Sequence, residues 1–217
     1  MKFFLPKIYP ITDRALSGLS HAEQVTQFAK GGAKLVQLRD KSSASGELYK
    51  AAVETVRAAN EAGVKLLIND RVDIAMLAHA HGVHLGQDDL PPREARKLLG
   101  NDAIIGVSTH TLGQVKTALD DAVADYLAFG PIFETVTKPD HEPLVGIEGL
   151  RAIRAAAAGI PLVAIGGINA QNLVSVFDAG ADSAAMIGEF YRSSAGISDS
   201  FRRLLEIAEC INQVKPY

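Results

Sequence analysis

Two apolar runs between residues 66 and 89 stop at acidic side chains. The first run ends in Asn69 and Asp70, and the second is followed by a Gly-Gln pair and then by Asp88 and Asp89. Carboxylates at neighbouring strand ends could share a hard cation, because Mg²⁺ is usually held by one or two carboxylates together with the phosphate oxygens of a substrate. The sequence therefore favours a Mg²⁺ site formed by Asp70 and either Asp88 or Asp89. A helix cap at Asp70 and a solvated turn at the second pair are the alternatives.

A group of hydrogen-bond donors follows another apolar run, in the pentapeptide QLRDK. In an extended segment, Gln37, Arg39 and Lys41 lie on one side. Leu38 and Asp40 lie on the other side. Cations that face carboxylates across one mouth would suit a diphosphate group bridged by a metal ion. An ordinary solvated run of charges is the alternative.

Two further segments could bind anions. The irregular stretch 130–146, GPIFETVTKPDHEPLVG, is expected to be a lid or binding loop, from which Lys138 would join the other cations. Gly166 and Gly167 precede a helical pattern, and glycine lets backbone amides approach a phosphate closely. The same pair would also suit a tight turn between a strand and a helix. His110 could act as an acid or base near neutral pH, or as a hydrogen-bonded spectator.

The elements that must position these residues repeat along the chain. Short runs rich in Val, Ile and Leu alternate with longer stretches that have helical spacing. The expected strands are 7–11, 35–38, 65–68, 82–85, 104–107, 126–129, 162–165 and 183–187. The expected helices are 22–30, 46–62, 72–79, 92–99, 112–121, 147–157, 170–179 and 198–212. Ser20, Thr111 and Asn169 are expected to cap three of these helices. Eight strands that alternate with helices pair in parallel and close most naturally into a (β/α)₈ TIM barrel.

In such a barrel the catalytic face lies at the carboxyl ends of the strands. The side chains that directly follow the apolar runs are therefore expected to meet at one mouth. The loops after the seventh and eighth strands form the usual phosphate site in this fold, which favours the phosphate interpretation of Gly166 and Gly167. The residues expected at the mouth are Thr12, Asp13, Gln37, Arg39, Lys41, Asn69, Asp70, Gln87, Asp88, Asp89, Ser108, His110, Thr135, Val136, Thr137, Lys138, Gly166, Gly167, Gly188 and Glu189.

The composition limits the class of protein. With 217 residues, of which 47% are hydrophobic and 22% charged, the chain suits a single catalytic domain over residues 1–217. A formal net charge of −3 provides no basic field for a nucleic acid. The lone Cys210 permits no internal disulfide, and the opening MKFFLPK is too short for a signal peptide or a membrane span. We expect a soluble cytoplasmic protein without a nucleic acid or membrane partner, and assembly into a homo-oligomer stays open.

Seven segments together resemble the thiamine phosphate synthase family. They run in order over almost the whole chain: YPITD (9–13), QLRDK (37–41), INDRVDIA (68–75), GVHLGQDDLP (82–91), GVSTH (106–110), DYLAFGPIFETVTK (125–138) and VAIGGI (163–168). The resemblance implies a TIM barrel that joins hydroxymethylpyrimidine diphosphate to thiazole phosphate, with release of pyrophosphate and formation of thiamine phosphate. It also implies Mg²⁺ as the cofactor and these two small molecules as the substrates.

The resemblance assigns roles residue by residue. The Mg²⁺ ligands would be Asp70 and Asp89, with Asp89 preferred to Asp88 because the family pattern is Gly-Gln-any-Asp. The implied contacts of the pyrimidine diphosphate are Gln37, Arg39, Lys41, Asn69, Ser108 and Lys138, and the binding segments also include Leu38, Asp40 and Val136. The implied contacts of the thiazole phosphate are Thr135, Thr137, Gly167 and the backbone of Ile187 and Gly188. The catalytic residues would be Arg39, Lys41, Lys138 and Ser108.

One departure from the family pattern bears on the thiazole side. Gly188 and Glu189 follow the eighth strand where the family often carries Ser or another polar residue, and a carboxylate aimed at a phosphate would repel it. Two rival functions remain. A related thiazole tautomerase, an isomerase without a metal, uses a histidine that matches His110 but typically lacks the paired acids, so Asp70 and Asp89 argue against it. A sensor that binds phosphorylated thiazole or thiamine phosphate without turnover would not need the full metal and diphosphate set.

Overall fold

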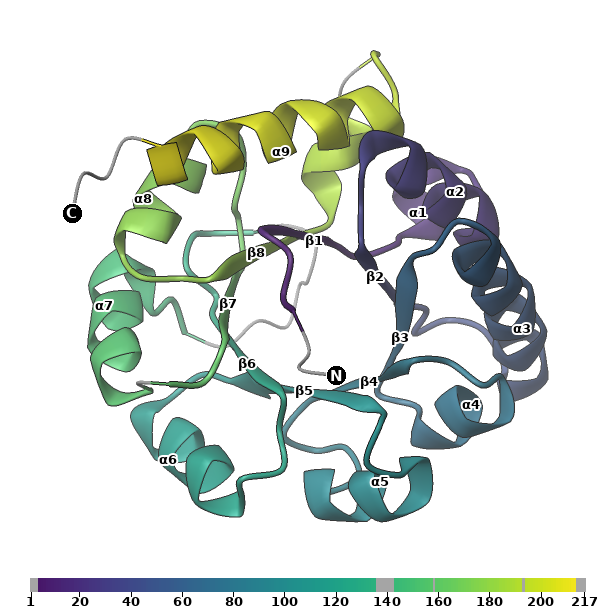
Figure 1. Cartoon of the computed structure of the whole chain (residues 1–217), viewed down its shortest axis with the longest axis horizontal. Helices are drawn as coiled ribbons and strands as arrows, with labels where there is room; N and C mark the ends of the chain where they lie inside the picture. The colour runs from purple at the N-terminus through teal and green to yellow at the C-terminus, as the bar shows by residue number, and fades with distance from the viewer. Residues whose placement is uncertain (1–3, 136–142, 158, 193, 214–217) are drawn as a thin grey trace.

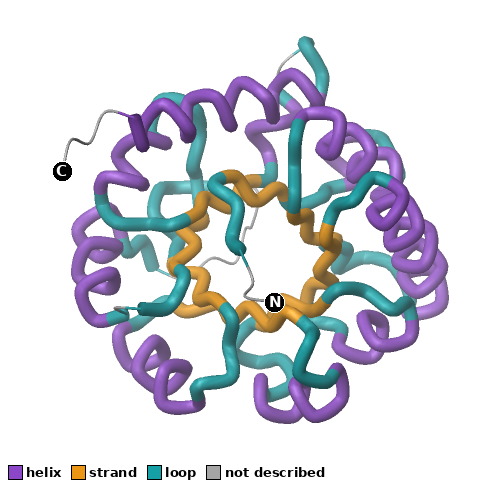
Figure 2. Tube along the Cα trace, viewed as in Figure 1, coloured by secondary structure: helices purple, strands orange, loops and turns teal. Residues whose placement is uncertain are grey.

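The structure, a computed structural model, describes residues 4–135, 143–157, 159–192 and 194–213. These residues form a nearly closed parallel barrel of eight strands with helices packed around it, as the alternating patterns predict. Figure 1 shows the strands as an inner ring, and Figure 2 separates this ring (orange) from the outer ring of helices (purple). The fold is therefore a (β/α)₈ TIM barrel.

The eight strands occupy the predicted positions, and their ends either match the predicted bounds or differ by at most two residues. They are β1 (Ile8–Pro10), β2 (Leu35–Leu38), β3 (Lys65–Asn69), β4 (Gly82–Leu85), β5 (Ile104–Thr109), β6 (Tyr126–Phe129), β7 (Leu162–Ile165) and β8 (Ser183–Met186). Their order in the sheet is β1-β8-β7-β6-β5-β4-β3-β2, with every pairing parallel. The barrel closes between β1 and β2 through a bridge from Ile11 to Gln37, beside which the Thr12 amide donates to the Gln37 carbonyl at 2.9 Å.

Most helices also lie within two residues of the predicted bounds. They are α2 (His21–Gly31), α3 (Ser45–Glu61), α4 (Val72–Leu77), α5 (Pro92–Leu99), α6 (Leu112–Asp121), α7 (Gly146–Ala156), α8 (Leu173–Asp178) and α9 (Ile197–Gln213). The predicted caps Ser20 and Thr111 are confirmed, since each forms a reciprocal capping box with the side chain three residues later. Two short elements were not predicted, the helix α1 (Arg14–Ser17) and the 3₁₀ turn η1 (Gly188–Tyr191).

Within the described part of the chain, no helix is both long and apolar enough to cross a membrane.

The start of α8 differs from the prediction. The Asn169 side chain accepts from the amides of Gln171 and Asn172 at 2.9 and 3.2 Å, and the Asn172 side chain accepts from the Asn169 amide at 2.8 Å. These bonds hold the segment in a turn, because Asn side chains compete with the helical pattern for nearby amides. The helix therefore begins at Leu173 rather than at residue 170, and Asn169 caps the turn instead of the helix.

The core has two layers. The outer layer lies between the sheet and the helices and contains most of the buried aliphatic side chains, among them Leu38, Leu66 and Leu85. The inner layer fills the barrel and includes Tyr9 and Tyr126, which are fully buried. Alternation along each strand sends neighbouring side chains to opposite layers. The inner layer therefore forms the floor beneath the residues that follow the strands.

Candidate active site

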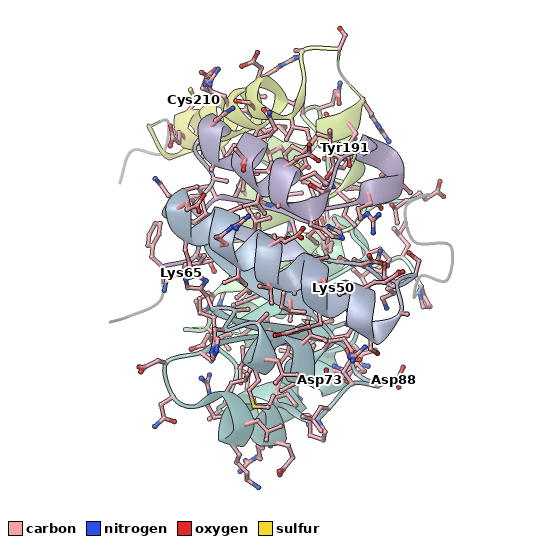
Figure 3. All side chains as sticks on the ribbon, turned by 90° about the vertical axis from the view of Figure 1, so that its right-hand side faces the viewer. Lys50, Lys65, Asp73, Asp88, Tyr191 and Cys210 are labelled. Carbon is pink, nitrogen blue, oxygen red and sulfur yellow. The ribbon has the colours of Figure 1, made fainter. Side chains whose placement is uncertain are left out.

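The residues that directly follow the strands meet at one end of the barrel, which we call the mouth. Figure 3 shows the barrel from the side: Lys65, the first residue of β3, lies toward the left, and Asp88, which follows β4, lies at the right. Because all eight strands are parallel, their carboxyl ends share the right-hand end of this view. The described site residues that follow the strands are thus brought to the same end of the molecule.

Asp70 directly follows β3 and lies in a constrained turn. Its φ of 62° lies in the left-handed region, which costs a residue other than glycine about 1–3 kcal/mol, although Asp tolerates it better than most. The turn is tight, since the Arg71 amide donates to the Asn69 carbonyl at 2.7 Å, while the Asp70 amide donates to the His84 carbonyl at 2.8 Å. Lys41 from the β2–α3 loop places its ammonium 3.2 Å from the Asp70 carboxylate. The structure thus joins the acidic and basic groups predicted from separate segments.

Asp89 lies against Asp70. Burial raises the pKa of the Asp89 carboxyl, and the neighbouring Asp70 carboxyl raises it further, while the Gly86 amide, which donates at 2.6 Å, opposes the shift. Asp88 is exposed, so of the two alternatives it is Asp89 that faces Asp70. Two oxygen donors held together against their mutual repulsion fit a hard divalent cation, which would relieve that repulsion. Among the described residues the acidic group stops at this pair, as no set of three or more His, Cys, Asp or Glu side chains is placed to hold a metal.

A chain of buried hydrogen bonds forms the floor of the mouth. The Gln37 amide group donates to the Tyr9 hydroxyl at 2.9 Å, and the hydroxyls of Tyr9 and Tyr126 lie 3.1 Å apart. His84 continues the chain, with Nδ1 2.8 Å from the Tyr126 hydroxyl and Nε2 2.9 Å from the Ser108 hydroxyl. Burial raises the pKa of both tyrosines well above the ordinary value, so the phenols stay protonated at neutral pH. The floor therefore joins two predicted substrate contacts, Gln37 and Ser108, from opposite sides of the barrel.

Tyr9, His84 and Tyr126 were not assigned to the site from the sequence. The alternation of inward-facing and outward-facing side chains along the strands could have indicated these three residues. In each of β1, β4 and β6, the polar ring alternates with an aliphatic neighbour that belongs to the outer core layer. A Tyr or His on the inner face of a small barrel needs a polar partner there. The alternation could thus have identified the floor, although not the order of its hydrogen bonds.

His110 is anchored at the end of β5. Its Nδ1 lies 2.7 Å from the Gly130 carbonyl oxygen, which can only accept, so Nδ1 carries the proton. The His110 amide donates to the Gln114 side chain at 2.7 Å. These contacts support the interpretation of His110 as a hydrogen-bonded residue that ties β5 to the start of the β6–α7 loop.

The Gly166-Gly167 pair packs against the start of the β6–α7 loop. Both residues have positive φ, 103° and 61°. A Cβ on Gly166 would lie 2.6 Å from Pro131 Cα, and one on Gly167 would lie 2.3 Å from the Glu134 carbonyl oxygen. Only glycine fits both positions, so close packing alone explains the pair. Whether the amides also bind a phosphate stays a prediction.

Glu189 turns toward the segment where the phosphate was predicted. Its carboxylate accepts from the Ala170 amide at 3.3 Å, and its other oxygen lies 3.7 Å from the Arg192 guanidinium. Gly188 begins the turn η1 that carries it, and Ile187 packs against the inner core layer. An acidic group therefore lies near the amides that follow β7.

Several residues of the predicted binding segments differ in their exposure. Leu38 is buried in the outer core layer, so only its backbone can reach a ligand, and the Asp40 carboxylate is bonded to Ser42 and Ser43 and faces His21 of α2. Thr135 is half-buried after β6. Val136, Thr137 and Lys138 lie outside the described residues.

Beside the mouth, a cavity of about 840 Å³ between the β1–α2 and β2–α3 loops is lined by Arg14, Arg39 and Lys41 among others.

Comparison with known proteins identifies the family. A family model described as thiamine monophosphate synthase matches residues 8–190. The chain belongs to the thiamine phosphate synthase family. Members of this family are transferases.

The relatives cover nearly the whole chain. A thiamine-phosphate synthase of Chloroflexus aurantiacus is 46% identical over 182 residues, 83% of each chain. One of Syntrophomonas wolfei is 45% identical over 203 residues, 93% of this chain and 96% of the relative. Among solved structures, thiamine phosphate pyrophosphorylase from Pyrococcus furiosus matches with a TM-score of 0.82 and 33% identity, over 94% of this chain and 96% of that one. The family and the barrel predicted from the sequence are thus both confirmed.

Proposed function

We propose that the protein joins a pyrimidine-methyl diphosphate to a thiazole phosphate, releasing pyrophosphate and forming thiamine phosphate, with Mg²⁺ held by Asp70 and Asp89. The observation that carries this proposal is the contact of the Asp70 and Asp89 carboxylates with each other, together with the ion pair between Asp70 and the Lys41 ammonium at the mouth. Such a constellation suits a metal-bound diphosphate, because the cation satisfies the acids and the basic side chain binds the remaining phosphate charge. The names of the relatives support the same assignment.

The bond that breaks joins the methylene carbon to the diphosphate oxygen, and its electron pair leaves with the oxygen. Arg39, Lys41 and Lys138 would stabilise the negative charge that grows there, and bound Mg²⁺ would act as a Lewis acid on the same oxygens. A pyrimidine-methyl cation remains, and the lone pair of the thiazole nitrogen then forms the new carbon–nitrogen bond. Because this cation is reactive toward water, the residues around it must exclude solvent and hold the two rings in contact.

The remaining predicted contacts divide between the two rings. Gln37, Asn69 and Ser108 would bind the pyrimidine above the floor that joins Gln37 to Ser108. The thiazole phosphate would lie between Thr135, Thr137 and Gly167 on one side and the backbone of Ile187 and Gly188 on the other. Since Glu189 accepts from the Ala170 amide in this region, its carboxylate would have to turn toward Arg192 when a phosphate binds.

The decisive experiment mixes the purified protein with both phosphorylated heterocycles and Mg²⁺ and detects thiamine phosphate by mass spectrometry. Formation of thiamine phosphate and pyrophosphate in equal amounts is expected, and EDTA should abolish both. Isomerisation of the thiazole alone, unaffected by EDTA, would instead indicate the tautomerase. Binding of thiamine phosphate without turnover would indicate a sensor. We also propose that the protein acts in the cytoplasm on small molecules, without a nucleic acid partner, and a homo-oligomer is compatible with this role.

A further inference from the structure

Behind the mouth, the side chains of Thr12, His21 and Asp40 and the backbone amide of Arg39 form a closed ring, and the proposed chemistry gives no role to these three side chains. Thr12 follows β1, His21 begins α2, and Arg39 and Asp40 follow β2. The Arg39 amide donates to the Thr12 hydroxyl oxygen at 3.3 Å, and this hydroxyl lies 2.7 Å from His21 Nδ1. The ring closes at 3.5 Å between His21 Nε2 and the Asp40 carboxylate, which the peptide bond connects back to Arg39. The residues that follow β1 and β2, and the start of α2, therefore meet beside the mouth.

The ring has a definite direction. His21 Nε2 is buried and, within the described part of the chain, has no hydrogen-bond partner, so the carboxylate is the polar group it faces. A ring nitrogen facing a carboxylate carries the proton, which leaves Nδ1 as an acceptor for the Thr12 hydroxyl proton. Arg39 then donates to Thr12, Thr12 donates to His21, and His21 points its N–H at Asp40. The N–H at His21 Nε2 is buried without a well-formed hydrogen bond, which usually costs about 1–3 kcal/mol of folding free energy. The fold tolerates this cost at the contact with Asp40.

Asp40 is fixed as an anion at the other side of the ring. Its carboxylate accepts from the amides of Ser42 and Ser43 at 2.9 and 3.0 Å and from their hydroxyls at 3.0 and 2.7 Å. Burial opposes ionisation, but these four hydrogen bonds hold the pKa of Asp40 well below its ordinary value. Arg14 adds a guanidinium at 3.6 Å. The Asp40 side chain is 4% exposed and that of His21 1% exposed, so both are almost fully covered where they border the cavity beside the mouth.

The ring determines the direction of the neighbouring side chains. Asp40 lies between Arg39 and Lys41 in the chain, and the Arg39 amide is itself bonded to Thr12. The ring therefore holds the backbone from which both cationic side chains extend. Lys41 reaches Asp70 at the mouth, and both cations line the adjoining cavity. The orientation of the two cations therefore depends on the contacts of Asp40, Thr12 and His21.

We propose that His21 is a positioning residue for the diphosphate-binding segment Arg39–Lys41. It does not contact the substrate, and it acts by holding Thr12 and Asp40 in the one arrangement that aims both cations at the mouth. This inference rests on the proposed function in its choice of ligand, a diphosphate. Residues that orient a binding group through a hydrogen bond commonly change affinity by about 10–100-fold when replaced.

The test replaces His21 and measures each substrate separately. For His21→Leu, the KM of the pyrimidine diphosphate and the inhibition constant of pyrophosphate should each rise about tenfold. The KM of the thiazole phosphate should stay within about twofold, because its predicted contacts lie after β6, β7 and β8. His21→Asn should recover part of the affinity, since its amide can occupy the place of Nδ1 beside Thr12. A merely structural role would lower the melting temperature and move both KM values together.

Matched variants separate the ring from general loss of stability. His81→Leu removes a half-buried histidine at the opposite end of the barrel, where Nδ1 accepts from the Leu66 amide at 3.1 Å. Thr12→Val removes the central hydroxyl of the ring, and Thr55→Val removes a buried hydroxyl that donates within α3. Thr12→Val should reproduce the effect of His21→Leu, and the double variant should be no worse than either. His81→Leu and Thr55→Val should leave the KM of the diphosphate unchanged.

The experiments distinguish failure of the proposed function from failure of the inference about the ring. If the wild type forms no thiamine phosphate, the proposed function fails, and calorimetric titration of wild type and variants with pyrophosphate and Mg²⁺ still tests the ring. If His21→Leu does not fold, Thr12→Val and His21→Asn are titrated in the same way. Weaker pyrophosphate binding in the ring variants but not in the controls supports the inference. Equal binding in wild type, Thr12→Val and His21→Asn overturns it.

Discussion

Asp89 is held against Asp70 although two carboxylates repel each other, and this contact allows the proposed metal site to be tested by a substitution that changes one side-chain group. Asp89→Asn keeps the shape but removes one anionic ligand. We expect the Mg²⁺ concentration for half-maximal turnover to rise at least about tenfold and turnover to fall by about 10²-fold. Without metal, the melting temperature should stay the same or rise, because the neutral amide of the variant does not repel the Asp70 carboxylate. Turnover assays over a Mg²⁺ series and thermal melts in EDTA check both parts.

Asp88→Asn is the matched control, since it makes the same change at the exposed neighbour. It should leave the Mg²⁺ dependence unaltered. An equal loss in both variants, or an unaltered Mg²⁺ dependence in Asp89→Asn, would contradict the assignment of the ligand pair.

Glu189 provides a second test with a single residue. Its carboxylate accepts from the Ala170 amide in the region predicted for the thiazole phosphate, so it competes with that ligand by charge and by position. Glu189→Ser should lower the KM of the thiazole phosphate by about threefold to tenfold, as removal of a like charge near a ligand is worth roughly 1 kcal/mol. Glu61→Ser, on the exposed end of α3, removes the same charge at a distance and should have no effect. Steady-state kinetics at fixed pyrimidine diphosphate would reveal a failure as equal KM values.

The side chains of the site were predictable only in part. The predicted strand ends placed Arg39, Lys41 and Asp70 at one end of the barrel, where Lys41 and Asp70 form an ion pair, while the alternation in QLRDK stays a prediction. The sequence could not show that Asp40 turns its carboxylate to Ser42 and Ser43, because this depends on the path of the loop. Nor could it show Glu189 beside the Ala170 amide, because that contact joins two separate loops.

At the scale of elements, an ion pair of the same kind precedes two of the strands, β6 and β8, at the N-terminal end of the barrel. Arg154 at the end of α7 donates to the carbonyls of Ala157 and Ile160 and pairs with Asp182 at 2.9 Å. The Asp182 carboxylate also accepts from the Leu162 amide at 2.8 Å. Arg96 at the end of α5 and Asp125 before β6 repeat the arrangement. Each pair thus ties a helix end to two strands.

Arg154→Met should therefore lower the free energy of unfolding by about 1–3 kcal/mol, since it leaves carbonyl groups and a carboxylate without their donor. Arg151→Met is the control from the same helix, because its pair with Glu148 is exposed and 3.5 Å long. That pair should contribute less than about 0.5 kcal/mol. Urea unfolding of the two variants measures the difference, and similar losses would show that the tie at the helix end has no special effect.

Elements were predicted best where one local rule dominates. Apolar runs with polar ends gave all eight strands, and Ser20 and Thr111 gave the starts of two helices. The prediction of α8 was wrong at its start because the amides there bond to Asn169 and Asn172 instead. The short elements α1 and η1 carry too few residues for a periodic signal. Local competition for hydrogen bonds, rather than the barrel itself, limited the prediction.

For the molecule as a whole, the buried His21 and the half-buried His81, at opposite ends of the barrel, respond to pH in the same sense. Burial lowers the pKa of His21, with the Asp40 carboxylate opposing, and burial together with Lys65 lowers the pKa of His81. His81 Nδ1 accepts from the Leu66 amide, a bond that protonation of this nitrogen would break. Both histidines are therefore favoured in the neutral form by the folded state.

The folded protein should lose stability as the pH falls below about 6.5, the ordinary pKa of histidine. Below that value the unfolded chain binds protons that the folded chain does not, so the free energy of unfolding rises with pH through the window between the folded pKa and the ordinary one. Acids with lowered pKa, such as Asp40, contribute only below about pH 4. Melting temperatures from pH 5 to pH 8 should fall toward the acidic side in the wild type.

His21→Leu and His81→Leu should each flatten part of this pH dependence, and the double variant should remove the sum of both parts. The two sites share no hydrogen-bond partner and lie at opposite ends of the barrel, so their effects should add. Differences between wild type and variant are compared at each pH, which cancels the contribution of the carboxylates common to both. A wild-type melting temperature that stays constant from pH 5 to pH 8 would mean that the folded barrel accommodates both imidazolium ions, and the ring behind the mouth would then have to tolerate a charged His21 beside Asp40.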